Sequence, residues 1–190
     1  MADLTVRRPN FEFPQDLPIM PDPQDRAYSA MCCALTIIVP HLERYLIRTM
    51  KTGLKEVTDP ALLQDMKDFS SQEANHFRNH DALNELLRNK LSDKARDELI
   101  QTEADLIEDY RRFSNTKSLR FNLAYAEGFE SATCALSLWG FEHETFKTLH
   151  DGWEELIEWH LAEEIEHRTV AFVAYHALGG NNAHRMIWGT

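Results

Sequence analysis

The sequence predicts an all-α protein built around a bundle of four long helices. Along four long stretches, apolar residues recur every three or four positions, which is the spacing of one helix face. Glycine and proline are scarce, with seven of each among 190 residues. No segment of useful length alternates apolar and polar residues, as a half-buried strand would.

The N-terminal segment is predicted to be an extended arm. Residues 1–24 hold five of the seven prolines, which fix backbone angles unsuited to a helix interior. We expect this arm to lie over the domain surface through Phe11 and Phe13. A helical pattern then covers residues 25–50, with a kink expected just before Pro40.

Capping residues delimit the remaining helices. Asp59-Pro60 is a typical helix start and opens a helix to about residue 89, and Ser92-Asp93 opens one to about residue 112. The later boundaries are a helix capped by Ser114 or Asn115 and running through Trp139, a short helical piece over 142–150, and a last long helix from Trp153 to Leu178 that ends at Gly179-Gly180. The predicted organisation is thus an arm over 1–24, a helical bundle over 25–180 and a C-terminal tail over 181–190. The tail ends in apolar residues, which is compatible with a further C-terminal segment.

The composition excludes several classes of function. With 20 basic and 31 acidic residues, the net charge is −11, so the chain lacks the basic surface that nucleic acid or an anionic membrane requires. Its longest strongly apolar run spans only residues 30–39, too few to cross a bilayer, and the N-terminus has no signal-peptide pattern. Cys32, Cys33 and Cys134 form no paired motif and are interpreted as reduced core residues. We therefore predict a cytoplasmic protein without a membrane span.

The four apolar stripes contain acids and histidines in their middle. The interruptions are Glu43 in the first helix, Glu73, His76 and His80 in the second, Glu127 and Glu130 in the helix through Trp139, and His160, Glu164 and His167 in the last. An unpaired carboxylate in a protein core is very costly. Acids in the core stripes of four separate helices therefore indicate that cations lie between them.

The types of ligand indicate two divalent metal ions. Residues 73–76 and 164–167 both read Glu-x-x-His, a spacing that projects the two side chains from one helix face. With one glutamate from each of the other two helices, they form the set found in di-iron and di-manganese carboxylate bundles. Oxygen and imidazole ligands suit iron or manganese without excluding zinc. We predict two iron ions, with manganese or zinc as alternatives.

Other polar residues near the stripes receive simpler interpretations. Glu163 and Glu166 flank the last stripe and are expected to face water. Four histidines outside the stripes are interpreted as surface or packing residues: His143, His150, His176 and His184.

Several pieces of the sequence resemble a known family. FPQDLPIMPDP, HLERYLIRTM, DFSSQEANHFRNHDALN and WHLAEEIEHRTVAF resemble the family described as predicted metal-dependent hydrolases, in the ferritin-like superfamily, over about residues 7–178. Its sharpest parts are QEANH and HLAEEIEH. The resemblance implies a ferritin-like four-helix bundle, here with one or two extra helices.

The order of the ligand-type residues is also similar to that of the di-iron arylamine N-oxygenases. By that resemblance, the metal ligands are Glu43, Glu73, His76, Glu127, His160, Glu164 and His167, with His160 as the seventh. The alternative for His160 is a residue that orients a ligand from outside, and we expect that role for His80. Glu130 stands where a small polar residue is expected, so it could replace or supplement Glu127.

The leading functional hypothesis is a di-iron oxidase or oxygenase that activates O2 to oxidise a small apolar or aromatic substrate, with no catalytic residue separate from the metal ligands. The expected pocket liners are Phe69, Phe77, Leu123, Trp153, Trp159 and Phe172. One alternative is a metal-dependent hydrolase that uses a metal-bound hydroxide, and another is non-enzymatic metal binding of the ferritin type. The sequence contains no Gly-x-Ser-x-Gly elbow or glycine-rich nucleotide loop. It is compatible with a homodimer and does not identify an electron donor.

Overall fold

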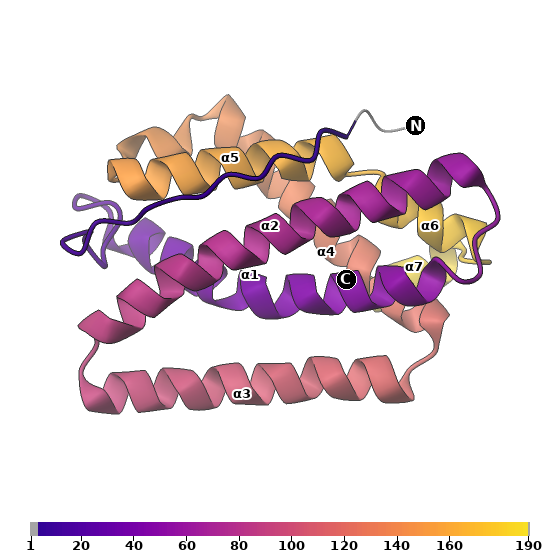
Figure 1. Cartoon of the computed structure of the whole chain (residues 1–190), viewed down its shortest axis with the longest axis horizontal. Coiled ribbons are helices and arrows are strands. Elements are labelled where there is room, and N and C mark those ends of the chain that lie inside the picture. Colours follow the sequence, from indigo (N-terminus) through magenta and orange to yellow (C-terminus); the bar gives the residue numbers. More distant parts are fainter. Residues whose placement is uncertain (1–3, 190) are drawn as a thin grey trace.

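The computed structural model describes residues 4–189, and in this range it contains helices and no β-strand, which confirms the all-α prediction. The elements, in chain order, are α1 (Arg26–Gly53), α2 (Pro60–Lys90), α3 (Asp93–Thr116), α4 (Leu119–Glu142), the 3-10 helix η1 (Thr145–Thr148), α5 (Asp151–His167), α6 (Val170–Ala177) and α7 (Asn182–Trp188). Figure 1 shows the long helices lying roughly along one direction.

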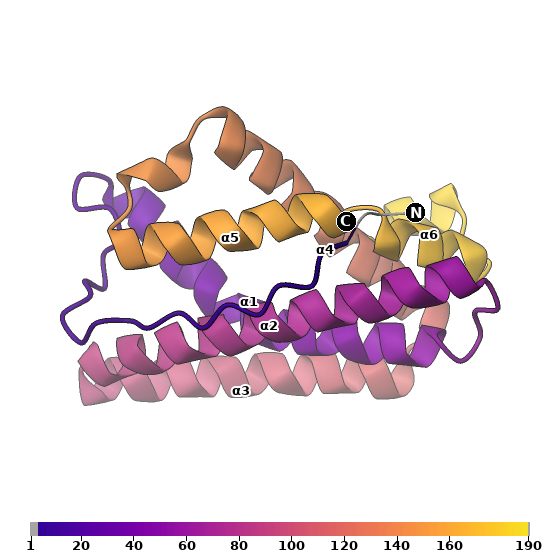
Figure 2. The same cartoon turned by 45° about the horizontal axis from the view of Figure 1, so that its top comes forward.

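The bundle consists of α1, α2, α4 and the consecutive helices α5 and α6. Helix α3 lies outside this bundle, mainly against α1, and returns the chain from the end of α2 to the start of α4 (Figures 1 and 2). Helices α2 and α4 consequently run in the same direction. One long crossover of this kind is the connection that ferritin-like bundles use.

Side-chain caps set most of the helix starts. Asp59 accepts hydrogen bonds from the first turn of α2, where Pro60 has no N–H to satisfy, and Ser92 caps α3. The expected cap of the next helix at Ser114 or Asn115 is wrong. Ser118 caps α4 by accepting from the Phe121 N–H at 3.1 Å, because α3 continues through residues 114 and 115.

The predicted last long helix is in fact two helices. Helix α5 ends at His167 and α6 begins at Val170, with Arg168 and Thr169 between them in a right-handed turn. No proline or glycine marks this interruption, so the helical spacing of apolar residues predicts one continuous helix across it. The expected stop at Gly179 is confirmed, because its φ of +85° is the left-handed conformation that favours glycine after a helix.

Helix α1 contains Pro40 and changes direction partway along its length (Figures 1 and 2), as the sequence predicted. By length and hydropathy alone, α1 would also pass as a membrane-spanning helix. Half of its apolar window is buried inside the bundle, and Glu43 on α1 is 2 % exposed in the core. Core helices meet the same criterion, so the expected absence of a membrane span stays a prediction.

Two apolar clusters occupy the two ends of the bundle. One surrounds Tyr45, Met66 and Phe69 between α1, α2, α4 and α6. The other surrounds Leu83 and Trp153 and includes residues of the arm. On α2, the buried Glu73, His76 and His80 lie between residues of the first cluster and residues of the second, as do Glu164 and His167 on α5. A polar layer therefore lies across the middle of an apolar core.

The arm runs in extended form between α2 and α5 (Figure 2). Phe11 and Phe13 pack on the second apolar cluster, and the Phe11 ring lies 5.4 Å from that of Trp159. At the other end of the chain, the expected tail contains α7, which packs on α4.

Candidate metal centre

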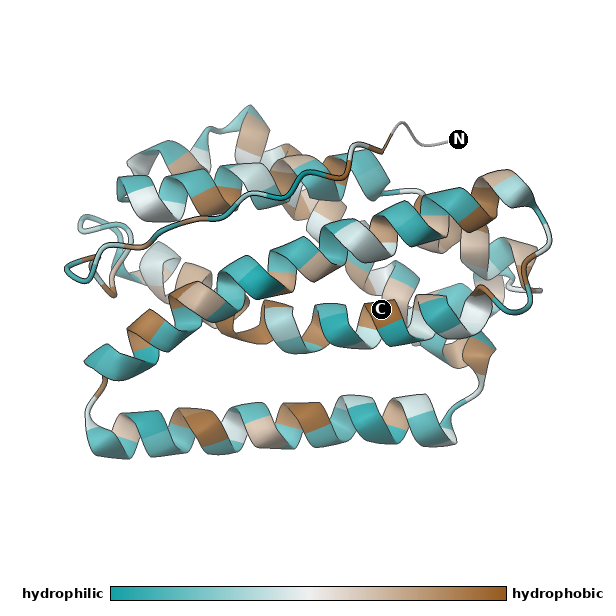
Figure 3. Cartoon of the chain, in the orientation of Figure 1, coloured by the Kyte–Doolittle hydropathy of each residue, from teal (hydrophilic) through white to brown (hydrophobic). Residues whose placement is uncertain are grey.

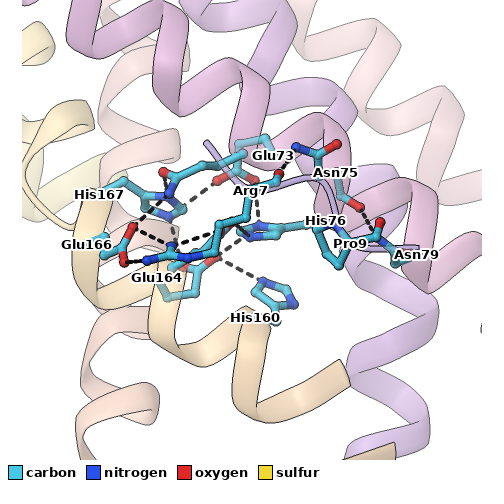
Figure 4. Close-up of polar contacts among 12 residues, drawn as sticks. Arg7, Pro9, Glu73, Asn75, His76, Asn79, His160, Glu164, Glu166 and His167 are labelled. Atoms are coloured by element: carbon cyan, nitrogen blue, oxygen red, sulfur yellow. Dashed lines mark hydrogen bonds and ion pairs between the residues drawn. The ribbon is translucent and has the colours of Figure 1, made fainter. Parts of the chain in front are cut away.

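Side chains from α1, α2 and α5 converge in the middle of the bundle. Among the described residues, two groups bring potential ligand atoms within 4.8 Å of one another: Glu43, His76, His160 and Glu164 form one group, and Glu73, Glu164 and His167 form the other. Six of the seven ligands expected from the sequence are in these groups. Glu164 belongs to both, so the two groups adjoin (Figure 4).

Glu73 and Glu164 each point one carboxylate oxygen toward the first group and the other oxygen toward the second. For Glu164, Oε1 lies 3.0 Å from His160 Nε2 and Oε2 lies 3.5 Å from His167 Nε2. For Glu73, Oε2 lies 3.9 Å from His76 Nδ1 and Oε1 lies 3.3 Å from His167 Nε2. Both Glu-x-x-His motifs thus supply a carboxylate that can bridge two ions and an imidazole that can bind one.

The outer carboxylates come from α1 and α4. Glu43 Oε1 lies 3.4 Å from His160 Nε2 and 3.6 Å from His76 Nδ1. On α4, Glu130 Oε2 lies 3.2 Å from His167 Nε2. Each half of the centre therefore has a glutamate that belongs to that half alone.

Glu127, the residue expected to serve as the α4 ligand, lies in neither group. Its Oε2 pairs with Arg185 Nε at 3.1 Å, and its Oε1 accepts a hydrogen bond from Ser131 at 2.7 Å. Arg185 is on α7, a helix that the sequence analysis treated as a tail. Because this arginine already neutralises Glu127, Glu130 is the α4 carboxylate that faces the histidines.

The hydrogen bonding of the buried side chains also indicates that the centre fits divalent cations. Several buried side-chain atoms at the centre have no hydrogen-bond partner: both carboxylate oxygens of Glu43 and of Glu73, His76 Nδ1, Glu130 Oε2, Glu164 Oε2 and His167 Nε2. Leaving so many buried polar atoms unpaired is costly. All of them are oxygen or imidazole nitrogen lone-pair sites, which are the donors that iron and manganese accept.

Burial and mutual repulsion disfavour the ionised form of the carboxylates at the centre. Burial, followed by repulsion from neighbouring carboxylates, raises the pKa of Glu43 well above its usual range, and burial raises that of Glu130 to about 7. Burial also opposes the charge of His167, but Glu164 and Glu130 outweigh it and raise the pKa of that imidazole. Divalent ions would remove this repulsion, since four carboxylates balance two such charges.

His80 lies behind His160 and does not join either group. His80 Nε2 is 2.7 Å from His160 Nδ1, and His80 Nδ1 is 2.5 Å from Thr36 Oγ1. With the His160 Nε2 lone pair free for a cation, Nδ1–H of His160 donates to His80 and Nδ1–H of His80 donates to Thr36. This chain fixes the plane of the His160 ring, which is the outer role that the sequence analysis expected of His80.

The expectation that Glu163 faces water is wrong. Its side chain is fully buried, and its Oε2 lies 3.0 Å from His76 Nε2. On the other motif, His167 Nδ1–H donates to Gln72 Oε1 at 3.2 Å. Both contacts leave the opposite ring nitrogen free for a cation. Neither Gln72 nor Glu163 could be identified from helix periodicity, because each borders the stripe rather than lying in it.

An apolar cavity adjoins the His160 side of the centre. Its lining comes from α1, α2, α4, α5 and η1 and includes Tyr28, Met31, Cys32, Leu35, Thr36, Val39, His80, Thr133, Leu136, Trp139, Gly140, Thr145, Ile157, His160, Leu161 and Glu164. Met31 and Trp139 are 39 % and 46 % exposed, so the cavity reaches from the molecular surface to the buried His160 and Glu164.

None of the expected pocket liners borders this cavity. Phe69, Leu123 and Trp153 are core residues, and Trp159 packs against His76. Phe77 and Phe172 lie beneath the guanidinium groups of Arg44 and Arg185. The prediction placed liners one turn from a ligand on the same helix, whereas the cavity is formed largely by residues of helices that face His160.

The fold and this centre define a class: a helical bundle with one long crossover and a buried carboxylate–histidine cluster able to hold metal ions. The comparison with family models identifies the family within it. The chain belongs to the family described as predicted metal-dependent hydrolases, whose model matches residues 5–190. Searches of curated proteins and of solved structures gave no significant match.

Proposed function

We propose that this protein is a di-iron carboxylate enzyme that uses O2 to oxidise a small apolar or aromatic substrate. The observation that carries the proposal is the juxtaposition of two adjoining ligand groups with an apolar cavity at His160. The family description supports a metal-dependent enzyme in general. The choice of oxidation over hydrolysis rests on the donor set and on the cavity.

The ligands would divide between two ions. One ion would be held by Glu43, His76 and His160, the other by Glu130 and His167, with Glu73 and Glu164 shared. This assignment replaces the predicted Glu127 by Glu130, because the latter is 3.2 Å from His167 Nε2. A bound iron pair would supply the electrons and the Lewis acidity that O2 activation requires.

The residues of the chain supply position and a dry environment. The aliphatic and aromatic lining of the cavity, which includes Val39, Leu136 and Ile157, excludes water and favours an apolar substrate. His160 lies at the inner end of the cavity, with its ring plane held by the His80–Thr36 chain. A substrate that enters past Trp139 therefore meets the centre at a side chain of fixed orientation.

Hydrolysis is the second candidate, because the family is described as a predicted metal-dependent hydrolase. A hydrolase needs a position open to water and a group that moves protons at the attacked bond. Glu43 is the best placed group, since both its oxygens are unpaired and one lies 3.4 Å from His160 Nε2. An apolar cavity is a poor path for the polar ester or phosphoester that such an enzyme would cleave.

Anaerobic loading with ferrous iron, followed by mixing with O2, separates the two candidates. We expect two iron ions per chain, rapid O2 consumption and a near-ultraviolet absorbance change. His160→Ala should retain most of the iron, because the other ligands remain, but should lose the oxygen-dependent change. His150→Ala, which alters a histidine outside the centre, is the control. Zinc-dependent cleavage of esters without any O2 consumption by the iron form would replace the proposal by the hydrolase.

A further inference from the structure

The N-terminal arm reaches the outer side of the metal centre through one side chain, Arg7 (Figure 4). Its Nη1 lies 3.1 Å from Glu163 Oε1, and its guanidinium binds both oxygens of Glu166 at 2.9 and 2.7 Å. Glu163 in turn contacts His76. Glu166 Oε2 accepts from Gln72 Nε2 at 3.0 Å, and Gln72 contacts His167.

These contacts form one continuous hydrogen-bonded chain around the centre. It runs from His76 through Glu163, Arg7, Glu166 and Gln72 to His167. Both ends are histidines whose opposite nitrogens face the two ligand groups. Arg7 is the link between the halves, and it comes from a segment that contributes no ligand.

We propose that Arg7 is a positioning residue for both halves of the metal centre, acting through Glu163 and Glu166 on the ring planes of the two motif histidines. This inference rests on the proposed metal centre. A planar guanidinium that binds a carboxylate with two parallel hydrogen bonds fixes orientation as well as charge. Residues that orient metal ligands from outside typically change metal affinity by about 10- to 100-fold.

The arm is anchored independently of the Arg7 side chain. Three amide side chains on the arm-facing side of α2 bind its backbone: Gln72 donates to the carbonyl of Thr5, Asn75 to that of Arg7 and Asn79 to that of Pro9. Removal of the Arg7 side chain beyond Cβ therefore leaves the arm anchored to α2.

Cobalt(II) titration tests the proposal, because the visible spectrum of this ion reports its coordination. We expect the wild type to bind two ions per chain and Arg7→Ala to bind them about tenfold more weakly, with a changed visible spectrum. Arg7→Lys should lie between them, since it keeps the charge without the fork. Arg8→Ala removes the same charge one residue along, at an exposed position, and should match the wild type.

Two further measurements distinguish positioning from a general loss of structure. Glu166→Gln breaks the same chain from its other side and should reproduce the Arg7→Ala spectrum. Millimolar guanidinium should restore the Arg7→Ala spectrum, because the Arg7 side chain is 44 % exposed and its space is open to solvent. Sodium chloride at equal ionic strength should not restore it.

The outcomes separate this inference from the proposed function. If wild type binds two cobalt ions and Arg7→Ala matches it in affinity and spectrum, the positioning role is wrong and the metal centre stands. If the spectrum of Arg7→Ala changes but neither guanidinium nor lysine restores it, the role is equally wrong. If the wild type binds fewer than two ions, the metal centre itself fails and this inference fails with it.

Discussion

At the scale of single residues, the centre combines side chains found by local spacing with side chains that only the fold identifies. The Glu-x-x-His motifs at 73–76 and 164–167 could be predicted, because spacing within one helix decides that both side chains share a face. The choice between Glu127 and Glu130 could not. It depends on Arg185, which reaches Glu127 from a helix far away in sequence.

Substitution of these two α4 glutamates gives a direct comparison. Glu130→Gln should reduce the bound metal from two ions to one, because the half of the centre at His167 loses the one glutamate that the other half does not share. Glu127→Gln should keep both ions and lower the melting temperature slightly through loss of the partly exposed Arg185 pair. Metal analysis after dialysis checks both variants. The reverse result, with metal lost in Glu127→Gln alone, would restore the assignment expected from the sequence.

At the scale of helices, the sequence predicts the start of a helix correctly where the capping residue and the first turn agree, as at Asp59-Pro60 and Ser92. The start of α4 is not predictable from local sequence, because Ser114, Asn115 and Ser118 are all residues that can cap the N-terminus of a helix. The α5–α6 interruption was missed for a different reason. Residues 168 and 169 keep right-handed backbone angles and carry no helix-breaking residue.

Replacement of the two candidate cap serines tests the observed boundary between α3 and α4. Ser118→Ala should lower the free energy of unfolding by about 1 kcal/mol, since the Phe121 N–H loses its acceptor. Ser114→Ala should change it by less than about 0.5 kcal/mol, because that hydroxyl only donates back to the Tyr110 carbonyl within α3. Urea titration of the metal-free proteins measures both. Equal losses would argue against the boundary at Ser118.

At the scale of the whole molecule, the polar layer makes stability depend on metal and on pH. In the metal-free protein, Glu43, Glu73 and Glu130 have raised pKa values, chiefly through burial. The native state then holds protons that the unfolded chain releases. The stability that these three carboxyl groups contribute to the native state is fully present below the ordinary carboxyl pKa. It is lost as the pH rises through their raised pKa values.

The metal-free protein should accordingly lose stability as the pH rises from about 4.5, the ordinary glutamate value, through the Glu130 pKa of about 7. The loss should continue to about pH 8, because the pKa values of Glu43 and Glu73 are raised well above their usual range. Below about pH 6.5 this loss with rising pH should be shallower, because two histidines then partly offset the three glutamates. Burial lowers the pKa values of His76 and His80, so the unfolded chain then binds protons that the native state refuses. Urea unfolding with a chelator at several pH values checks this prediction. A stability that rises steadily from pH 6.5 to pH 8 would contradict it.

Metal should reverse the dependence above pH 6.5 and raise the melting temperature, because ions bind the native carboxylates in their charged form. Manganese-loaded protein is the appropriate comparison, since it carries no oxidation step. Identical melting curves with manganese and with chelator would indicate that the buried acids are held by something other than metal.

The central claim is that one buried layer holds two ions between the same pair of bridging glutamates. Anomalous diffraction from a crystal of the manganese-loaded protein tests it most directly. We predict two peaks about 3.5–4 Å apart, as in other two-metal sites, both between Glu73 and Glu164, with His76 and His160 beside one and His167 beside the other. A single peak, or peaks confined to the acidic surface while Glu73 and Glu164 remain without a metal, would contradict the account.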